Sequence, residues 1–319
     1  MKILNRLNKL KKPRSKNKNI FNSLKINNSS KHLIGIDNKG LIVVLINSIK
    51  PKGNGEYLSN IIIKHGVNCS VHLKNEKLTK KFTMIKCLSN DNSTKELFLM
   101  SLERILENIP NEVSEIKIDE LTKKLVKLFE KLSNKINIDL TGFWGELFII
   151  DYLKSTELLV EAWHPETNDL FDFFLKNLAL EVKTTTKNDR KHIFKFEQLN
   201  SKSNKIIIGS IMLKRSRAGK SLLDLKKKIL KKISKTELIE KVNEIYAIMV
   251  ANKSQKELDS EKYSYEYAKE NISFFDSVKI PRIKETPMYG IKNIKFESDL
   301  NISKSINNFS EYPFLKKLK

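Results

Sequence analysis

Residues 170–187 read LFDFFLKNLALEVKTTTK, two apolar runs interrupted first by an aspartate and then by a glutamate and a lysine. Apolar runs on both sides of the dipeptide Lys176-Asn177 predict strands at 170–175 and 178–185. If this dipeptide is the two-residue turn of a hairpin, Leu175 pairs with Leu178 and Asp172 lies directly opposite Glu181. The stretch therefore predicts a hairpin that sets two carboxylates face to face.

One face of this predicted hairpin carries three charged side chains. Opposed residues of an antiparallel pair have Cβ atoms about 4.5–5.5 Å apart, where two like charges destabilise the sheet. Glu181 and Lys183 project from the same face because side chains alternate along a strand. Asp172, Glu181 and Lys183 should therefore lie together, and a cation between the two carboxylates would offset their repulsion.

Carboxylate oxygens in this arrangement suit Mg²⁺ or Mn²⁺, which bind one or two carboxylates, keep several waters and accept a phosphate oxygen. A metal ion held there could activate water and stabilise charge on a phosphate. Lys183 would stand beside the attacking water or the phosphate, as an electrostatic stabiliser or as a proton acceptor. The residues leave both roles open and predict a metal-dependent phosphodiesterase. A solvated sheet face with an ordinary ion pair is the bland alternative, which Phe171, Phe173 and Phe174 disfavour.

The order of these residues resembles a known signature. Asp172, eight residues and then Glu181-Val182-Lys183 look like the D…ExK motif of the PD-(D/E)xK nuclease superfamily. The resemblance implies an α/β (α+β) restriction-endonuclease-like core, with a mixed central sheet flanked by helices, and Mg²⁺-dependent cleavage of DNA. It also implies that Glu146, in GFWGELFIIDYL, completes the metal site and that Gln198, in KFEQL, orients phosphate or water.

A bacterial family of PD-(D/E)xK-motif proteins from restriction-modification-like defence operons is similar over more of the chain. Its members resemble GFWGELFIIDYL, EAWHPETNDLFDFF, LALEVKTTT and FEQL in order and spacing, over residues 140–200 and more weakly to 297. One departure is that Pro165 lies seven residues before Asp172 instead of beside it. This resemblance implies methyltransferase and ATPase or helicase-like partners from the same operon.

Basic segments could bind the nucleic-acid backbone on either side of the scissile bond. The run KTTTKNDRKH at 183–192 and the sequence RSR at 215–217 offer side chains that hydrogen-bond phosphates without reading sequence. A solvated loop is an equally compatible reading of the first run. The candidate nucleic-acid-binding residues are Thr184, Thr185, Lys187, Arg190, Lys191, Arg215 and Arg217.

The whole chain, of 319 residues with a formal charge of +23, predicts a globular protein with a basic start. Residues 1–31 hold ten basic residues and no acid, so 1–29 is predicted to be a flexible arm that neutralises phosphates, with a merely solvated tail as the alternative. Residues 30–112 read as a β-rich α+β region and 113–319 as the nuclease core with C-terminal strands. Within that core the pattern predicts a strand at 158–163 and one helical stretch at 221–248.

The cellular context follows from absences in the sequence. No apolar run approaches the roughly 18 residues that a membrane span needs, and Cys69 and Cys87 form no metal or disulfide motif. A cytoplasmic protein without a membrane partner is expected.

The function predicted from the sequence is that of a DNA endonuclease in a bacterial restriction or anti-phage system. A homodimer would supply the two sites that cutting both strands calls for. Two alternatives remain: an RNA-specific or structure-specific nuclease, and a non-catalytic nucleic-acid-binding or scaffolding subunit with the same fold.

Overall fold

The computed structural model describes residues 6–15, 17, 19–27, 30–49, 55–58, 60–74, 76–89, 92–107, 109–133, 139–164, 170–175, 178–201, 205–250, 253–284 and 290–307. The chain forms two compact units, Met1–Ile136 with Val250–Asn252, and Asn137–Met249 with Lys253–Lys319. The boundary expected at 112/113 therefore lies at 136/137. The physical reason is the helix α3 (Glu115–Ser133), whose Phe129 ring packs 5.9 Å from Phe98 on α2 (Asn92–Glu107) within the first unit.

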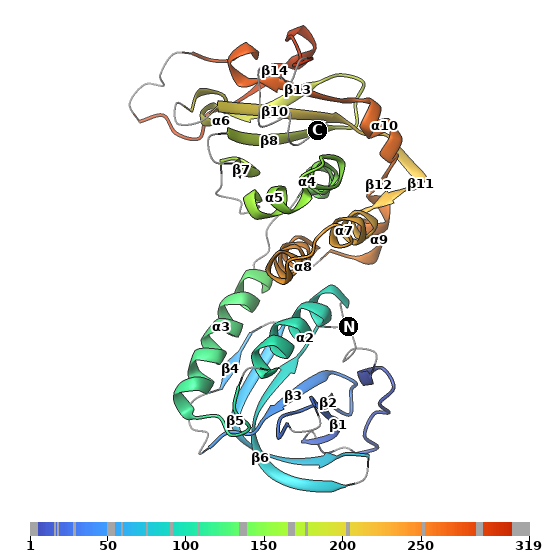
Figure 1. Cartoon of the computed structure of the whole chain (residues 1–319), viewed down its shortest axis with the longest axis vertical. Coiled ribbons are helices and arrows are strands. Elements are labelled where there is room, and N and C mark those ends of the chain that lie inside the picture. Colours follow the sequence, from blue (N-terminus) through green and yellow to red (C-terminus); the bar gives the residue numbers. More distant parts are fainter. Residues whose placement is uncertain are drawn as a thin grey trace. The chain divides into compact units, whose positions relative to one another are not determined.

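The first unit contains a closed β-barrel. Its strands are β1 (Ile20–Lys25), β2 (Leu33–Ile36), β3 (Ile42–Ile46), β5 (Ile61–His72) and β6 (Lys77–Cys87), with the short β4 (Glu56–Tyr57) beside β5. The order is β1-β2-β3-β6-β5, and β1 closes the sheet by pairing in parallel with β5 (Figure 1). Phe21, Val43, Cys69 and Val71 fill its interior.

Local sequence explains the turns of this barrel. β2 and β3 form a hairpin. In its turn Gly40 takes a φ of +84°, which other residue types rarely adopt, and the Gly40 N–H donates to the Asp37 carbonyl. In β5 the register shifts between Lys64 and Val67, where Gly66 has a φ of +64°. This shift is a β-bulge, and β5 continues through it as one strand.

The first strand corrects the prediction of a flexible arm over 1–29. Phe21 is fully buried and Leu7 is 3% exposed, so residues 20–25 are an integral part of the barrel. The apolar alternation of IFNSLK is short and lies among lysines and asparagines, which is why charge dominated the prediction.

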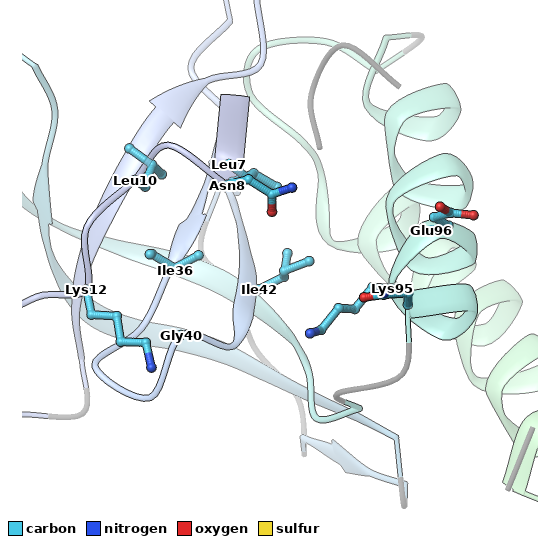
Figure 2. Close-up of a pocket in the computed structure, with 10 residues that line it drawn as sticks. Leu7, Asn8, Leu10, Lys12, Ile36, Gly40, Ile42, Lys95 and Glu96 are labelled. Carbon is cyan, nitrogen blue, oxygen red and sulfur yellow. The ribbon is translucent and has the colours of Figure 1, made fainter. Parts of the chain in front are cut away.

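A cavity of about 350 Å³ opens in the first unit between the N-terminal segment, the β2–β3 hairpin and the start of α2. Apolar side chains of Leu7, Leu10, Ile36 and Ile42 line it, with Lys12 and Lys95 beside them (Figure 2).

The second unit is built on a mixed four-stranded sheet flanked by helices (Figure 1). Its order is β13 (Ile272–Asp276), β10 (Lys205–Met212), β8 (Leu178–Thr185) and β7 (Phe173–Leu175), with only β8 and β10 parallel. Leu175 pairs with Leu178 as predicted, while the turn residues Lys176 and Asn177 lie outside the described residues. The restriction-endonuclease-like α/β architecture expected from the sequence is confirmed.

Helices cover one face of this sheet. The helix α4 (Leu140–Tyr152) begins where the Asp139 carboxylate accepts the Thr141 N–H, and it packs on β8 and on α7 (Leu222–Leu230). The helix α5 (Thr156–Ala162) stands where a strand was predicted at 158–163, because TELLVEA combines strong helix formers after a turn. The segment predicted as one helix at 221–248 divides into α7, which Ser221 caps, and α8 (Thr236–Val250).

The opposite face is covered by a strand pair and short helices. The strand β9 (Lys191–Lys195) pairs with β14 (Lys295–Asp299), and α6 (Phe196–Asn200) follows β9 directly. Phe194, Leu199 and Leu300 pack with Ile206 and Ile208 of β10 in one buried cluster.

The remaining elements lie at the edges of the second unit: β11 (Arg215–Ser221) with β12 (Lys262–Tyr263), α9 (Gln255–Ser260), α10 (Tyr265–Glu270), η1 (Ser277–Lys279) and η2 (Leu300–Ile302). None of the helices in the described part of the chain is both long enough and apolar enough to cross a membrane.

Candidate active site

Three carboxylates reach one region of the second unit from three elements. Glu146 comes from α4, Glu181 from β8, and Asp172 lies one residue before β7. The last register pair is Phe173 with Leu180, so the next step along both strands sets Asp172 opposite Glu181. The described pairing ends at Phe173 and Leu180, so the direct pairing of Asp172 with Glu181 stays a prediction.

Two hydrogen bonds with backbone N–H groups hold Asp172 in place. Its carbonyl accepts the N–H of His164 at 2.9 Å, and its Oδ2 accepts the N–H of Val182 at 2.7 Å. The carboxylate therefore replaces a backbone acceptor at the point where the β7–β8 pairing ends.

Glu181 is buried, with 5% of its surface exposed, and one of its carboxylate oxygens contacts two partners. Oε1 lies 2.7 Å from the Lys183 ammonium and accepts the Gln198 Nε2–H at 2.6 Å. Among the described residues no hydrogen bond reaches Oε2. One oxygen thus anchors the local network, and the other remains available to a ligand.

Gln198 holds this network together from the opposite side. Its Oε1 accepts the N–H of Lys195 at 2.9 Å and lies 3.4 Å from Lys183 Nζ, while Nε2 also donates to the Leu170 carbonyl. The Lys183 ammonium rests 5.3 Å from the centre of the Phe194 ring. Lys183 is therefore held by a carboxylate, an amide oxygen and an aromatic face.

Glu146 is the carboxylate whose ionisation is most clearly perturbed. Burial raises its pKa to about 8; the hydrogen bond from Trp163 Nε1 to Oε2, at 2.7 Å, opposes the rise, and the charges of Glu181 and Asp139 add to it. The raised pKa favours the protonated form of Glu146 at neutral pH.

Asp172 is perturbed in the same direction. Burial, with the nearby charges of Glu181 and Glu146, raises its pKa well above the usual aspartate range, against the Val182 hydrogen bond and the Lys183 charge. Carboxylates that repel one another away from water form a set that a cation would stabilise.

The three carboxylates can be compared with the ligands that Mg²⁺ and Mn²⁺ prefer. No group of three or more His, Cys, Asp or Glu side chains stands ready as a metal cluster among the residues that the structure describes. Mg²⁺ commonly takes only one or two carboxylates and keeps waters, so Asp172 and Glu181 fit as its protein ligands. Glu146 fits as an acid that acts beside them.

The residues predicted to bind nucleic acid beside the site differ in their surroundings. Lys187 and Lys191 are exposed, Thr184 is partly buried, and Thr185 is 8% exposed and caps the turn by accepting the Lys187 N–H. Arg190 turns inward: its guanidinium donates to the Ser210 carbonyl and hydroxyl and to the Asn271 carbonyl, at 2.7–3.0 Å. These hydrogen bonds tie Arg190 to β10 and to the residue that follows α10, so its guanidinium stabilises the fold.

Arg215 and Arg217 lie on β11, apart from the carboxylates in sequence. Arg215 donates to Glu261 Oε1 and to the Ser260 carbonyl, both at 3.0 Å, and stacks on Tyr263, whereas Arg217 is exposed. Their role in nucleic-acid binding stays a prediction.

Sequence reasoning missed two supporting groups. Trp163 supplies the hydrogen bond to Glu146, and His192 lies buried with its Nε2 2.8 Å from the Oγ of Ser210, which pairs with Lys183 across β8 and β10. Burial, and next the charges of Lys183 and Arg190, lower the pKa of His192 to about 4. The only signal in the sequence was the apolar alternation of β9, which points His192 and Phe194 to one face.

The comparison with known families agrees with this geometry. A family model described as "Putative PD-(D/E)XK family member, (DUF4420)" matches residues 4–301. The chain belongs to this family, which links its fold to the PD-(D/E)XK nucleases, a group that generally uses divalent metals. No curated protein and no solved structure matches the chain.

Proposed function

We propose that this protein is a Mg²⁺- or Mn²⁺-dependent nuclease that hydrolyses phosphodiester bonds of DNA. The observation that carries the proposal is the gathering of Asp172, Glu181 and Lys183 at the end of one hairpin, with Glu146 close enough to raise the pKa of Asp172. Membership of a PD-(D/E)XK family supports the reaction class.

The metal ion, when bound by Asp172 and Glu181, would supply charge stabilisation and activation of water. The chain itself contributes positioning. Lys183 carries a fixed positive charge beside the scissile phosphate, because Glu181, Gln198 and Phe194 together restrict its ammonium. Such preorganised charge stabilises a transition state without reorganisation.

Glu146, in the protonated form that its raised pKa favours, could donate a proton in the reaction. Its pKa of about 8 lies near neutral pH, where proton transfer to a leaving oxygen is most effective. Trp163 fixes the orientation of this acid through Oε2.

The biological setting is part of the proposal. We place the activity in a bacterial restriction or anti-phage system, with DNA as substrate and with methyltransferase and ATPase or helicase-like partners. The support for this setting is the resemblance of the motifs GFWGELFIIDYL and LALEVKTTT to proteins of such operons.

Cleavage assays test the proposal directly. Supercoiled plasmid, linear duplex, single-stranded DNA and RNA would be incubated with the protein in Mg²⁺, Mn²⁺ or EDTA. We expect nicking or linearisation of DNA only with a metal ion. Cutting of RNA alone would favour the RNA-specific alternative, and binding of DNA without cutting would favour the non-catalytic subunit.

Variants assign the activity to the site. Asp172→Asn, Glu181→Gln and Lys183→Met should each lower cutting by about 100-fold or more while DNA affinity changes little. Glu197→Gln is the matched control, since this exposed acid lies one residue from Gln198 and outside the network. Unchanged cutting by the three site variants would refute the assignment.

A further inference from the structure

The charge of the chain is concentrated in its barrel. Residues 1–89 contain 19 lysines and arginines and three acids, which gives +16 of the formal +23. Residues 90–136, which include α2 and α3, contain eight basic and nine acidic residues. A general preference for lysine would raise both segments alike, so the contrast is a property of residues 1–89. Within them, residues 1–19 before β1 hold eight basic residues and no acid, and residues 20–89 hold 11 basic residues and three acids.

Two of the three acids in the barrel are neutralised. Asp37 is 2% exposed and lies 2.9 Å from the Lys86 ammonium, and Glu76 lies 4.0 Å from that of Lys25. Only Glu56 is exposed without an ion pair in the described part of the barrel. Apart from Glu56, the charged side chains exposed on the described part of the barrel are therefore basic or ion-paired.

One face of the barrel combines this charge with hydrogen-bonding groups. Cys69 and Val71 of β5 point into the core, so their neighbours along the strand point outward. Across β5 and β6 the outward residues pair as Asn68 with Lys81, Ser70 with Thr79, and His72 with Lys77. This β5–β6 face consists of Asn68, Ser70, His72, Lys77, Thr79 and Lys81, and it contains no acid.

We propose that the β5–β6 face is a second nucleic-acid-binding surface, separate from the catalytic residues. Lysines contact phosphates, and amide and hydroxyl groups add hydrogen bonds to the backbone. A membrane surface fits less well, because the six residues of the face include no apolar anchor.

The apolar cavity in the same unit does not compete for this role. Leu7, Leu10, Ile36 and Ile42 line it together with the charged side chains of Lys12, Lys95 and Glu96, and none of the six residues of the β5–β6 face contributes to it (Figure 2).

Charge reversal tests the face in the full-length protein. The double variant Lys77→Glu/Lys81→Glu would be compared with Lys124→Glu/Lys127→Glu, which makes the same charge change at exposed positions on α3. Binding to a labelled 30-base-pair duplex would be followed by fluorescence anisotropy over a range of salt concentrations in EDTA, so that no cleavage occurs. Lys77→Arg/Lys81→Arg keeps the charge and should bind like the wild type.

We expect the variant of the β5–β6 face to bind about tenfold or more weakly. The slope of log affinity against log salt should also fall by about 0.9 for each phosphate that the variant no longer neutralises. An equal weakening in the α3 variant would overturn the proposal, as would binding to phosphatidylserine vesicles in place of DNA. Glu181→Gln should bind normally, so failure of cleavage and failure of this surface can be told apart.

Discussion

Lys183 Nζ and Gln198 Nε2 converge on the same oxygen of Glu181, at 2.7 Å and 2.6 Å. The carboxylate is thus held by a charge from its own strand and by an amide from α6. At the proposed site, binding of a metal ion by Glu181 would be coupled to the positioning of Lys183, since Gln198 also accepts from Lys183.

Gln198→Leu should lower the cleavage rate by roughly 10- to 100-fold with little effect on DNA affinity. The variant keeps the side-chain size but removes every hydrogen bond from this position to Glu181 and Lys183. Plasmid-nicking rates at saturating DNA would measure the effect. Asn200→Ala is the control, because this amide binds the Phe196 and Ile283 carbonyls away from the carboxylates; an equal decrease there would point to a general disturbance of α6.

Trp163→Phe should raise the pKa of Glu146 above about 8, since the indole hydrogen bond favours the ionised form. Carboxyl-carbon NMR of Glu146 over pH 6–10 would report the shift. Trp144→Phe is the matched control, because the Trp144 indole is equally buried but donates to the Lys220 carbonyl and not to Glu146. An unchanged titration in Trp163→Phe would exclude the indole as an influence on this acid.

Glu146→Gln should stabilise the protein at alkaline pH. The unfolded chain ionises this group near pH 4.5 and the folded chain near 8, so folding takes up a proton between these values and wild-type stability falls as pH rises through them. Urea unfolding at pH 5, 7 and 9 should therefore show a growing advantage of the variant. A constant difference across pH would contradict the raised pKa.

His192→Gln should flatten the decline of stability in acid. Burial lowers the pKa of His192 to about 4 in the folded chain; the charges of Lys183 and Arg190 add to this effect and that of Asp189 opposes it. In the unfolded chain the same imidazole takes up a proton near pH 6.5. Wild-type stability therefore falls as pH drops from 6.5 to 4. Unfolding free energies of the wild type and of His192→Gln would be measured from pH 7 to pH 4, and their difference reports His192 alone, because Glu146 and Asp172 are present in both proteins and shift stability in the opposite sense. A difference that does not change with pH would contradict the lowered pKa of His192.

Gly145→Val should destabilise the second unit by about 1–3 kcal/mol. A Cβ at Gly145 would lie 2.3 Å from Thr184 Cγ2, so α4 would be pushed off β8. A Cβ at Gly142, on the same helix, would lie 3.3 Å from Asp139 Oδ2, so this side chain would have to shift slightly, and Gly142→Ala should change stability by less than about 1 kcal/mol. Thermal unfolding would measure both; similar effects would mean that α4 does not pack closely on the sheet.

Local rules were enough to predict the hairpin and the faces of its residues. The pairing of Leu175 with Leu178 and the common face of Glu181 and Lys183 both follow from alternation along a strand. Glu146 and Gln198 came from the resemblance and not from periodicity, because a single acid on an apolar helix has many explanations.

Interactions between distant segments could not be predicted in this way. Trp163 looked like an ordinary core residue, and Arg190 looked like a phosphate ligand until its partners on β10 and at Asn271 were known. The apolar residues of 158–163 predicted a strand, yet this segment forms the helix α5, which helix propensity and packing on β7 stabilise. For Trp163 and Arg190 the decisive hydrogen-bond partner lies more than ten residues away in the sequence.

The parallel pairing of β1 with β5 also orders events during synthesis of the chain. β1 leaves the ribosome first, but its partner is complete only when residue 72 has emerged, so closure waits on a distant segment. A fragment beginning after Lys25 would leave β2 and β5 with open edges that can pair with other chains. Truncation of the lysine-rich start should therefore cause aggregation of the nascent protein, well before any decrease in affinity for DNA could be measured.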